Sequence, residues 1–214
     1  MNYKQRGRAI IFNHYKFQTL NSRDGTDLDE KNLKKRLSAL NFDIKVHRDL
    51  KYMEIYQTLQ TAAEDKHEDV GCLMIIVLTH GESNGLHAYD HMYSVDTLWT
   101  PFVGNKCPSL VGKPKIFLIQ VTIFYFVGYY SWRSPLNGSW FIECLCKELE
   151  KHASERDFLT ILTFVNRRMA IDYESNVPDV AYMHKKKQIG SIMTTLTRLL
   201  YFYEHNLILE EGTE

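Results

Sequence analysis

Apolar residues gather in three short runs upstream of His80, at 9–13, 42–46 and 72–79. The first and third runs are almost uninterrupted, and the second alternates with polar residues. Runs of this length and pattern are typical of β-strands. The third run ends abruptly in His80-Gly81-Glu82, which predicts the end of a buried strand.

Two stretches between these runs carry apolar residues at helical spacing and predict amphipathic helices. Asp27, with Glu30 three residues later, predicts the cap of the first helix. The predicted inward stripes are Leu33, Leu37 and Leu40 on the first helix and Met53, Tyr56, Leu59 and Ala63 on the second.

The longest apolar run, residues 116–127, lies within the stretch 113–133 and predicts the central strand of the fold. A strand buried on both faces of a parallel sheet has such a continuous pattern. The run is shorter than the ~20 apolar residues that a membrane-spanning helix needs. Gln120 and Thr122 also interrupt it, so it predicts core and not membrane.

The second half of the chain predicts smaller elements. Residues 86–93 resemble a hairpin and 95–103 a short helix. Ser139 and Asp157 can each cap an amphipathic helix that follows them. Residues 188–203 are rich in β-branched and aromatic residues, which predicts a late strand at a sheet edge.

This order predicts an α/β fold in which a mostly parallel central sheet has helices on both faces. Residues 1–214 are expected to form a single compact domain. Parallel sheets bind ligands at the carboxyl ends of their strands. Arg23 follows the first strand, His80 ends the third and Gln120 lies in the central run, so the three are expected to meet at one rim.

Composition narrows the function classes. The 214 residues carry 26 basic and 26 acidic side chains, which predicts no nucleic-acid or membrane partner. The first residues lack the apolar core of a signal peptide, so we expect a cytoplasmic protein with reduced cysteines. Cys144 and Cys146 have no second ligand pair nearby, and neither a metal nor a cofactor is expected.

Several blocks, in order, resemble the caspase family and its effector members most closely. The resemblance covers nearly the whole chain and implies a caspase-like fold. An isolated His-Gly-Glu tripeptide would not imply such a fold. The blocks lie at residues 22–26, 78–82, 113–120, 128–133, 137–141, 162–174 and 187–203.

Caspases are cysteine endopeptidases that cut after aspartate, and the resemblance assigns roles to several residues. His80 would be the general base, and the Gly81 amide would form part of an oxyanion hole. Guanidinium and amide groups suit recognition of a substrate carboxylate. The substrate-binding residues implied by the resemblance are Arg23, Gln120, Tyr130, Ser131, Trp132 and Arg133.

The sequence departs from the family at the nucleophile. The family places a cysteine two residues after this glutamine, whereas here Thr122 occupies that place. Residues 1–120 resemble the large subunit and 121–203 the small subunit, joined without the linker and followed by a tail at 204–214. A threonine hydroxyl is far less ionised than a thiol, so we expect no protease activity.

Three hypotheses about function follow. The first is a catalytically defective caspase homologue that regulates an active caspase in apoptosis by dimerising with it or with itself, and that holds Asp-containing peptides. The second is a shortened form of an active aspartate-specific endopeptidase, and a scaffold unrelated to proteolysis is a weaker third. The expected dimer interface comprises Ile189, Ile192, Met193, Thr194 and Leu196 of the late strand.

How the sheet is completed is left open by the sequence. The segment that the family places after the nucleophile is nearly absent here. The sheet could form with one strand fewer, a partner could support it, or the sequence could be an incomplete version of an active enzyme.

Overall fold

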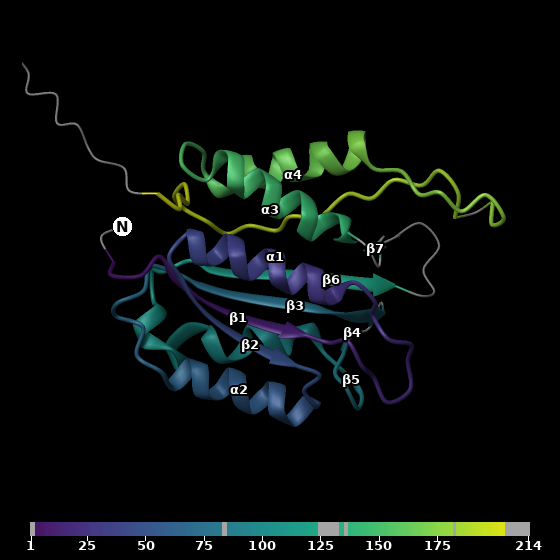
Figure 1. The fold of residues 1–214 in the computed structure, drawn as a ribbon. Helices are drawn as coiled ribbons and strands as arrows, with labels where there is room; N and C mark the ends of the chain where they lie inside the picture. Colours follow the sequence, from purple (N-terminus) through teal and green to yellow (C-terminus); the bar gives the residue numbers. More distant parts are fainter. Residues whose placement is uncertain (1–2, 83–84, 124–132, 135–136, 182, 204–214) are drawn as a thin grey trace, which may run out of the picture.

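The computed structural model describes residues 3–82, 85–123, 133–134, 137–181 and 183–203. A six-stranded sheet forms its centre, with the order β2-β1-β3-β4-β5 and with β6 paired to β3 (Figure 1). Its strands are β1 (Gly7–Asn13), β2 (Phe42–Arg48), β3 (Leu73–Glu82), β4 (Gly85–His87), β5 (Met92–Tyr93) and β6 (Lys115–Ile123). A two-stranded sheet consists of β7 (Arg133–Ser134) and β8 (Gly138–Ser139).

The central sheet is mostly parallel, as the sequence predicted. β1 runs parallel to β2 and to β3, and β3 runs parallel to β6. The short hairpin strands β4 and β5 are antiparallel, and they extend from the end of β3. The carboxyl ends of β1, β3 and β6 therefore share one edge of the sheet.

Helices cover both faces of this sheet (Figure 1). α1, α3 and α4 lie on one face and α2 on the other. Their bounds are α1 (Thr26–Ala39), α2 (Tyr52–Glu64), α3 (Trp140–His152) and α4 (Phe158–Asp172). Four 3-10 turns follow β5, at Val95–Leu98, Thr100–Phe102, Gly104–Lys106 and Pro108–Leu110.

Two apolar layers result from the alternation of side chains along the strands. On β1, Ala9 and Ile11 face α1, α3 and α4, whereas Ile10 and Phe12 face α2. The side chains of β3 from Leu73 to Leu78 are at most 1% exposed on either face. β3 is therefore the central strand, a place that the sequence had suggested for the 116–127 run.

Helix details differ in part from the predictions. Asp157 accepts hydrogen bonds from the backbone N–H groups of Leu159 and Thr160, which confirms it as a cap. Ser139 precedes α3, but its side chain makes no cap hydrogen bond. Asp27 is wrong as a cap, because Gly25 takes that position with φ of 86° and Asp27 falls in the first turn.

The inward stripe of α2 was also partly wrong. Met53 and Tyr56 are 53% and 41% exposed, so they face solvent. The buried stripe consists of Ile55, Leu59, Ala62 and Ala63, so Leu59 and Ala63 are confirmed, and Ile55 and Ala62 are buried in place of Met53 and Tyr56.

Two boundary predictions need correction. The expected short helix at 95–103 is a pair of separate 3-10 turns, because Pro101 supplies no N–H to continue the first one. β3 does not end before His80 but continues to Glu82, because Gly81 and Glu82 pair with β4.

The predicted late strand at 188–203 is wrong for the structure described. Within the described part of the chain these residues form an extended segment that pairs with no strand. Asn166 of α4 instead bonds both backbone groups of Gly190, at 2.9 Å each. A strand needs a neighbour at hydrogen-bonding distance, and no described strand lies beside this segment.

The central run forms β6 up to Ile123, and its predicted remainder, 124–127, lies outside the described residues. Among the described helices, none is long and apolar enough to cross a membrane.

Candidate active site and family

His80 lies near the carboxyl end of β3 and is 1% exposed. In the parallel pairing of β3 with β6, it stands opposite Thr122. Its Nδ1 lies 3.4 Å from the backbone carbonyl oxygen of Thr122, and its Nε2 lies 2.9 Å from that of Asn21. This contact with Thr122 therefore involves the backbone and not the hydroxyl.

Phe17 packs against the His80 ring, with the centroids 4.6 Å apart. Two carbonyl oxygens and one aromatic ring thus fix the orientation of the imidazole. A neutral imidazole can donate to only one of the two carbonyls, whereas an imidazolium can donate to both.

Gly81 follows His80 at a position where β3 lies very close to the Val121 side chain of β6. A Cβ on Gly81 would lie 2.8 Å from Cγ1 of Val121 in the neighbouring β6. This distance is shorter than ordinary van der Waals contact, so the pairing of β3 and β6 requires glycine here. The packing places the Gly81 amide beside His80 at the end of the sheet.

Arg23 is completely buried in the loop between β1 and α1. Its Nη1 donates to the carbonyl oxygen of His14 at 3.1 Å and to Oγ1 of Thr26 at 2.9 Å. The same loop carries Asn21, which contacts His80. Arg23 and His80 therefore belong to the same end of the sheet, as the sequence predicted.

A chain of hydrogen bonds, buried as far as Glu30, continues from Thr26. Its hydroxyl donates to Asn13 Oδ1 at 2.6 Å, and Asn13 Nδ2 donates to Glu30 Oε2 at 2.9 Å. Arg48 then donates twice to the Glu30 carboxylate, at 2.8 and 2.9 Å. Burial by itself would raise the pKa of Glu30, but the bonds from Arg48 and Asn13 outweigh it and lower the pKa.

His14 is also completely buried beside this network. Burial lowers its pKa to about 4, with Asp49 acting against the shift and the positive charge of Arg23 adding to it. His14 is therefore neutral at pH 7. It leaves Arg23 as the buried cation of this region.

Gln120 is 4% exposed and stands opposite Leu78 of β3, two positions before Thr122. Its Nε2 lies 3.4 Å from the carbonyl oxygen of Val121. β6 therefore brings Gln120 to the same edge of the sheet as His80.

The remaining predicted substrate residues are placed only in part. Tyr130, Ser131 and Trp132 lie outside the described residues. The backbone of Arg133 belongs to β7 and pairs with Ser139, and its side chain is outside the description. β8 is anchored to the helix layer, since Ser139 N donates to Asp29 Oδ1 at 2.8 Å.

The four cysteines belong to other parts of the fold. Cys72 precedes β3 and is separated from His80 by about 26 Å of extended strand. Burial raises the pKa of Cys72 and Cys146 to about 12 and that of Cys144 to about 11. Cys107 is 1% exposed in the loop before β6.

The predicted dimer residues lie mostly on the surface. Ile189, Ile192 and Met193 are 66%, 42% and 95% exposed, and Thr194 is exposed as well. Leu196 is half-buried and packs against the layer that contains α1, α3 and α4. The segment therefore presents apolar side chains to solvent although it forms no strand.

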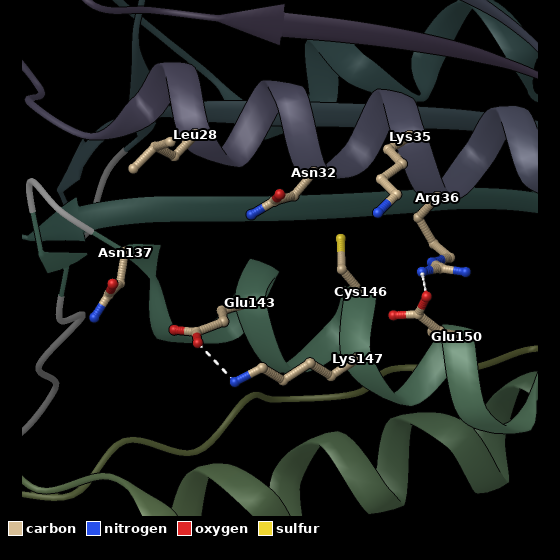
Figure 2. Close-up of a pocket in the computed structure, with 9 residues that line it drawn as sticks. All are labelled: Leu28, Asn32, Lys35, Arg36, Asn137, Glu143, Cys146, Lys147 and Glu150. Carbon is tan, nitrogen blue, oxygen red and sulfur yellow. Dashed lines mark hydrogen bonds and ion pairs between the residues drawn. The ribbon is translucent and has the colours of Figure 1, made fainter.

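A separate polar cavity of about 300 Å³ lies between α1 and α3 (Figure 2). Ion pairs join Arg36 to Glu150 at 2.6 Å and Lys147 to Glu143 at 2.7 Å along its wall. It lies on the face of the sheet that α1, α3 and α4 cover, and none of the residues predicted for the site lines it. Among the described residues, no group of three or more His, Cys, Asp or Glu side chains could hold a metal ion.

Comparison with known proteins identifies the family. A model of the caspase domain matches residues 6–122 and 126–201. The chain belongs to the caspase family. It is 43% identical to "Caspase-1" of Spodoptera frugiperda, with 94% of this chain and 80% of that protein covered. "Caspase drICE" of Drosophila melanogaster is 39% identical, with coverages of 97% and 73%.

The fold is that of a caspase. The crystal structure of caspase-1 from Spodoptera frugiperda superposes with a TM-score of 0.91 and covers 98% of this chain and 94% of that one. The sequence alignment with this relative spans 239 residues, whereas this chain has 214 in total. The relative therefore has residues within the aligned span that this chain lacks.

Some residues around the site escaped sequence reasoning. No sequence pattern pointed to the contacts that the Asn21 carbonyl and the Phe17 ring make with His80, because both residues belong to an irregular loop. Asn13 did carry one, since it is a polar residue that ends an apolar strand. Thr26 and Glu30 lie four residues apart on α1, and this spacing places both side chains on the helix face toward Asn13.

Proposed function

We propose that this caspase-family protein is catalytically defective and regulates an active caspase in apoptosis by pairing with it in the cytoplasm. The observation that carries this proposal is the position opposite His80, where β6 presents Thr122 and no thiol. A hydroxyl is a weak nucleophile without a dedicated base. The His80 ring nitrogens lie beside the backbone carbonyl oxygens of Thr122 and Asn21.

A catalytically defective caspase homologue would still be able to bind peptides. Arg23 and Gln120 are held at the same end of the sheet, and Arg133 follows in β7. A guanidinium group and an amide suit a carboxylate, so Asp-containing peptides are the expected ligands. Residues 1–120 and 121–203 would correspond to the two subunits of the family, with 204–214 as a tail.

The exposed apolar side chains of residues 189–193 support pairing with a second chain. Ile189, Ile192 and Met193 are 66%, 42% and 95% exposed, and a run of exposed apolar side chains is typical of an interaction surface. An extended segment can pair with a related strand. A caspase partner is expected, because the family dimerises through this block.

The test is co-purification with an active effector caspase. Met193→Asp should abolish recovery of the complex, because it places a charge in the interface and leaves the monomer fold unaffected at a 95% exposed position. Val111→Asp is the matched control, since Val111 is 68% exposed and lies far along the chain. Equal recovery of both variants would refute this interface.

A second candidate function is supported by the alignment length. The residues that the Spodoptera relative has in excess could reflect a longer form of this protein with a complete catalytic loop. That form would be an aspartate-specific cysteine endopeptidase. Sequencing of transcripts across Gln120 and Val121 decides between the two: only the short form is expected, and a longer form with a cysteine in this region would favour the enzyme.

A further inference from the structure

The pairing of β6 with β3 determines which backbone groups of β6 point toward β3 and which point away from it. Leu73 N donates to the carbonyl oxygen of Pro114 at 3.0 Å, so this residue directs its backbone toward β3. Backbone groups alternate in direction along a strand. The N–H and C=O groups of Phe117, Ile119 and Val121 therefore point away from β3.

No strand among the described residues pairs with β6 on that outer side. The three outward residues occur at every second position, about 6.6 Å apart. Donors and acceptors in this spacing match the backbone of another extended strand. Isolated side chains or small ligands would satisfy them only in part, as the 3.4 Å contact of Gln120 Nε2 with the Val121 carbonyl illustrates.

Both faces of this edge are apolar. Ile116 and Leu118 belong to the layer with α1, α3 and α4, whereas Phe117, Ile119 and Val121 belong to the layer with α2. Apart from Leu118, at 8% exposure, these side chains are only half-buried. A strand laid against this edge would continue both layers and would need apolar residues on both of its own faces.

The edge also lacks the usual protection against pairing. Exposed edge strands generally carry charged residues, prolines or bulges that prevent association. From Ile116 to Ile123 there is neither a charge nor a proline. The register with β3 is continuous from Lys115 to Ile123, so no bulge turns the edge away.

We propose that the outer edge of β6 accepts an extended, uncharged, apolar segment of another polypeptide chain as an added strand. The occupant is a strand because the outward backbone groups require one, and it is apolar because both flanking layers are. The family match breaks between residues 122 and 126, directly at the end of β6.

This added-strand site uses residues different from those of the proposed dimer surface at 189–196. It would stand if pairing with a caspase failed, and it would fall if the β6 edge were covered within the chain. The two proposals are therefore separable by experiment.

Residue-resolved amide exchange of the full chain tests the proposal. The probe is a synthetic peptide with the sequence of residues 115–123 and added lysines at its ends for solubility. In the free protein, Phe117, Ile119 and Val121 amides should exchange much faster than that of Leu118, which faces β3. Saturating peptide should slow the three outward amides by about tenfold or more.

Two outcomes would overturn the proposal. One is protection of the three outward amides in the monomeric protein without peptide, which would mean that the chain covers its own edge. The other is an unchanged exchange rate at saturating peptide.

Variants at Ile119 give an independent check. Ile119→Pro removes an outward N–H, which an edge strand tolerates, and Ile119→Lys adds a charge to the edge. Each should reduce peptide affinity at least about tenfold, whereas Val111→Lys should leave it unchanged. Should the proline variant fail to fold, the lysine variant decides, and full peptide affinity in that folded variant would contradict the proposal.

Discussion

The His80 imidazole contacts two backbone carbonyl oxygens, one from Asn21 and one from Thr122. A base that activates a thiol must lie within hydrogen-bond reach of it, about 2.6–3.2 Å. The cysteines lie in other elements, and burial raises the pKa of three of them to about 11 or 12. Among the described residues, β6 therefore presents a threonine and not a thiol opposite His80.

Gly81 gives a stability prediction for the same region. Gly81→Ala should lower the free energy of unfolding by about 1–3 kcal/mol, because the new Cβ would lie 2.8 Å from Val121 Cγ1. The Gly81→Ala/Val121→Ala double variant should lose less than the two single variants together. Urea denaturation of all four proteins measures this coupling, and simple additivity would argue against the contact.

His14 predicts how stability depends on pH. Its folded pKa of about 4 lies below the ordinary value of 6.5, because burial disfavours the charged ring. The unfolded chain therefore takes up the proton first, so stability is complete above pH 6.5 and is lost as the pH falls toward 4. The expected loss from this group between pH 7.5 and 5 is about 2 kcal/mol.

His14→Gln should remove this part of the pH dependence, as followed by urea denaturation at each pH. His91→Gln, at an exposed position, is the control and should retain the slope of the parent protein. A His14→Gln variant with the slope of the parent would contradict the assignment.

The segment at residues 188–200 shows what holds an element that has no strand partner among the described residues. Asn166 of α4 bonds both backbone groups of Gly190, and Phe158 N donates to the carbonyl oxygen of Leu200 at 2.7 Å. Leu200 and Phe202 are buried in the layer of α1, α3 and α4. The segment is thus fixed at two points, and Ile192, Met193 and Leu199 are exposed between them.

Asn166→Ala should loosen this segment without affecting the sheet. Loss of two hydrogen bonds, worth roughly 0.5–1.5 kcal/mol each, should speed amide exchange at residues 188–196 and leave that of β1 and β3 unchanged. Asn137→Ala, an exposed asparagine between β7 and β8, is the control. Equal exchange in both variants would show that Asn166 does not anchor the segment.

The elements that the sequence predicted well are those defined by their own side chains. β1, β2 and both stripes of β3 follow from apolar runs, and the Asp157 cap follows from local chemistry. The element that failed was the late strand, because strand formation depends on a neighbour and not on composition alone. The predicted cap of α1 was also wrong. The sequence offers Asp27, a usual capping residue, and does not show that Gly25 adopts a φ of 86° and takes the cap position.

Only the site residues within the blocks that resemble the caspase family could be predicted from the sequence. His80, Arg23 and Gln120 were expected at one edge of the sheet, and the parallel register brings β3 and β6 together there. The polar chain from Arg23 through Thr26 and Asn13 was not expected, since it depends on how α1 packs against β1.

The whole molecule keeps the architecture of its relatives while it lacks part of their length. A TM-score of 0.91 over 98% of the chain shows that the sheet and both helix layers are retained. The alignment with the Spodoptera relative is longer than this chain, and the family match breaks next to β6. The chain thus retains the family scaffold, with Thr122 opposite His80.

The rate at which an active effector caspase cleaves a fluorogenic Asp tetrapeptide, titrated with this purified protein, tests the central claim most directly. A regulatory pseudoenzyme predicts no cleavage by the protein alone and a saturable rise or fall in the partner's rate, absent with Met193→Asp. A constant rate with a folded sample would contradict the claim. Cleavage by the protein alone that disappears in His80→Ala would contradict it as well.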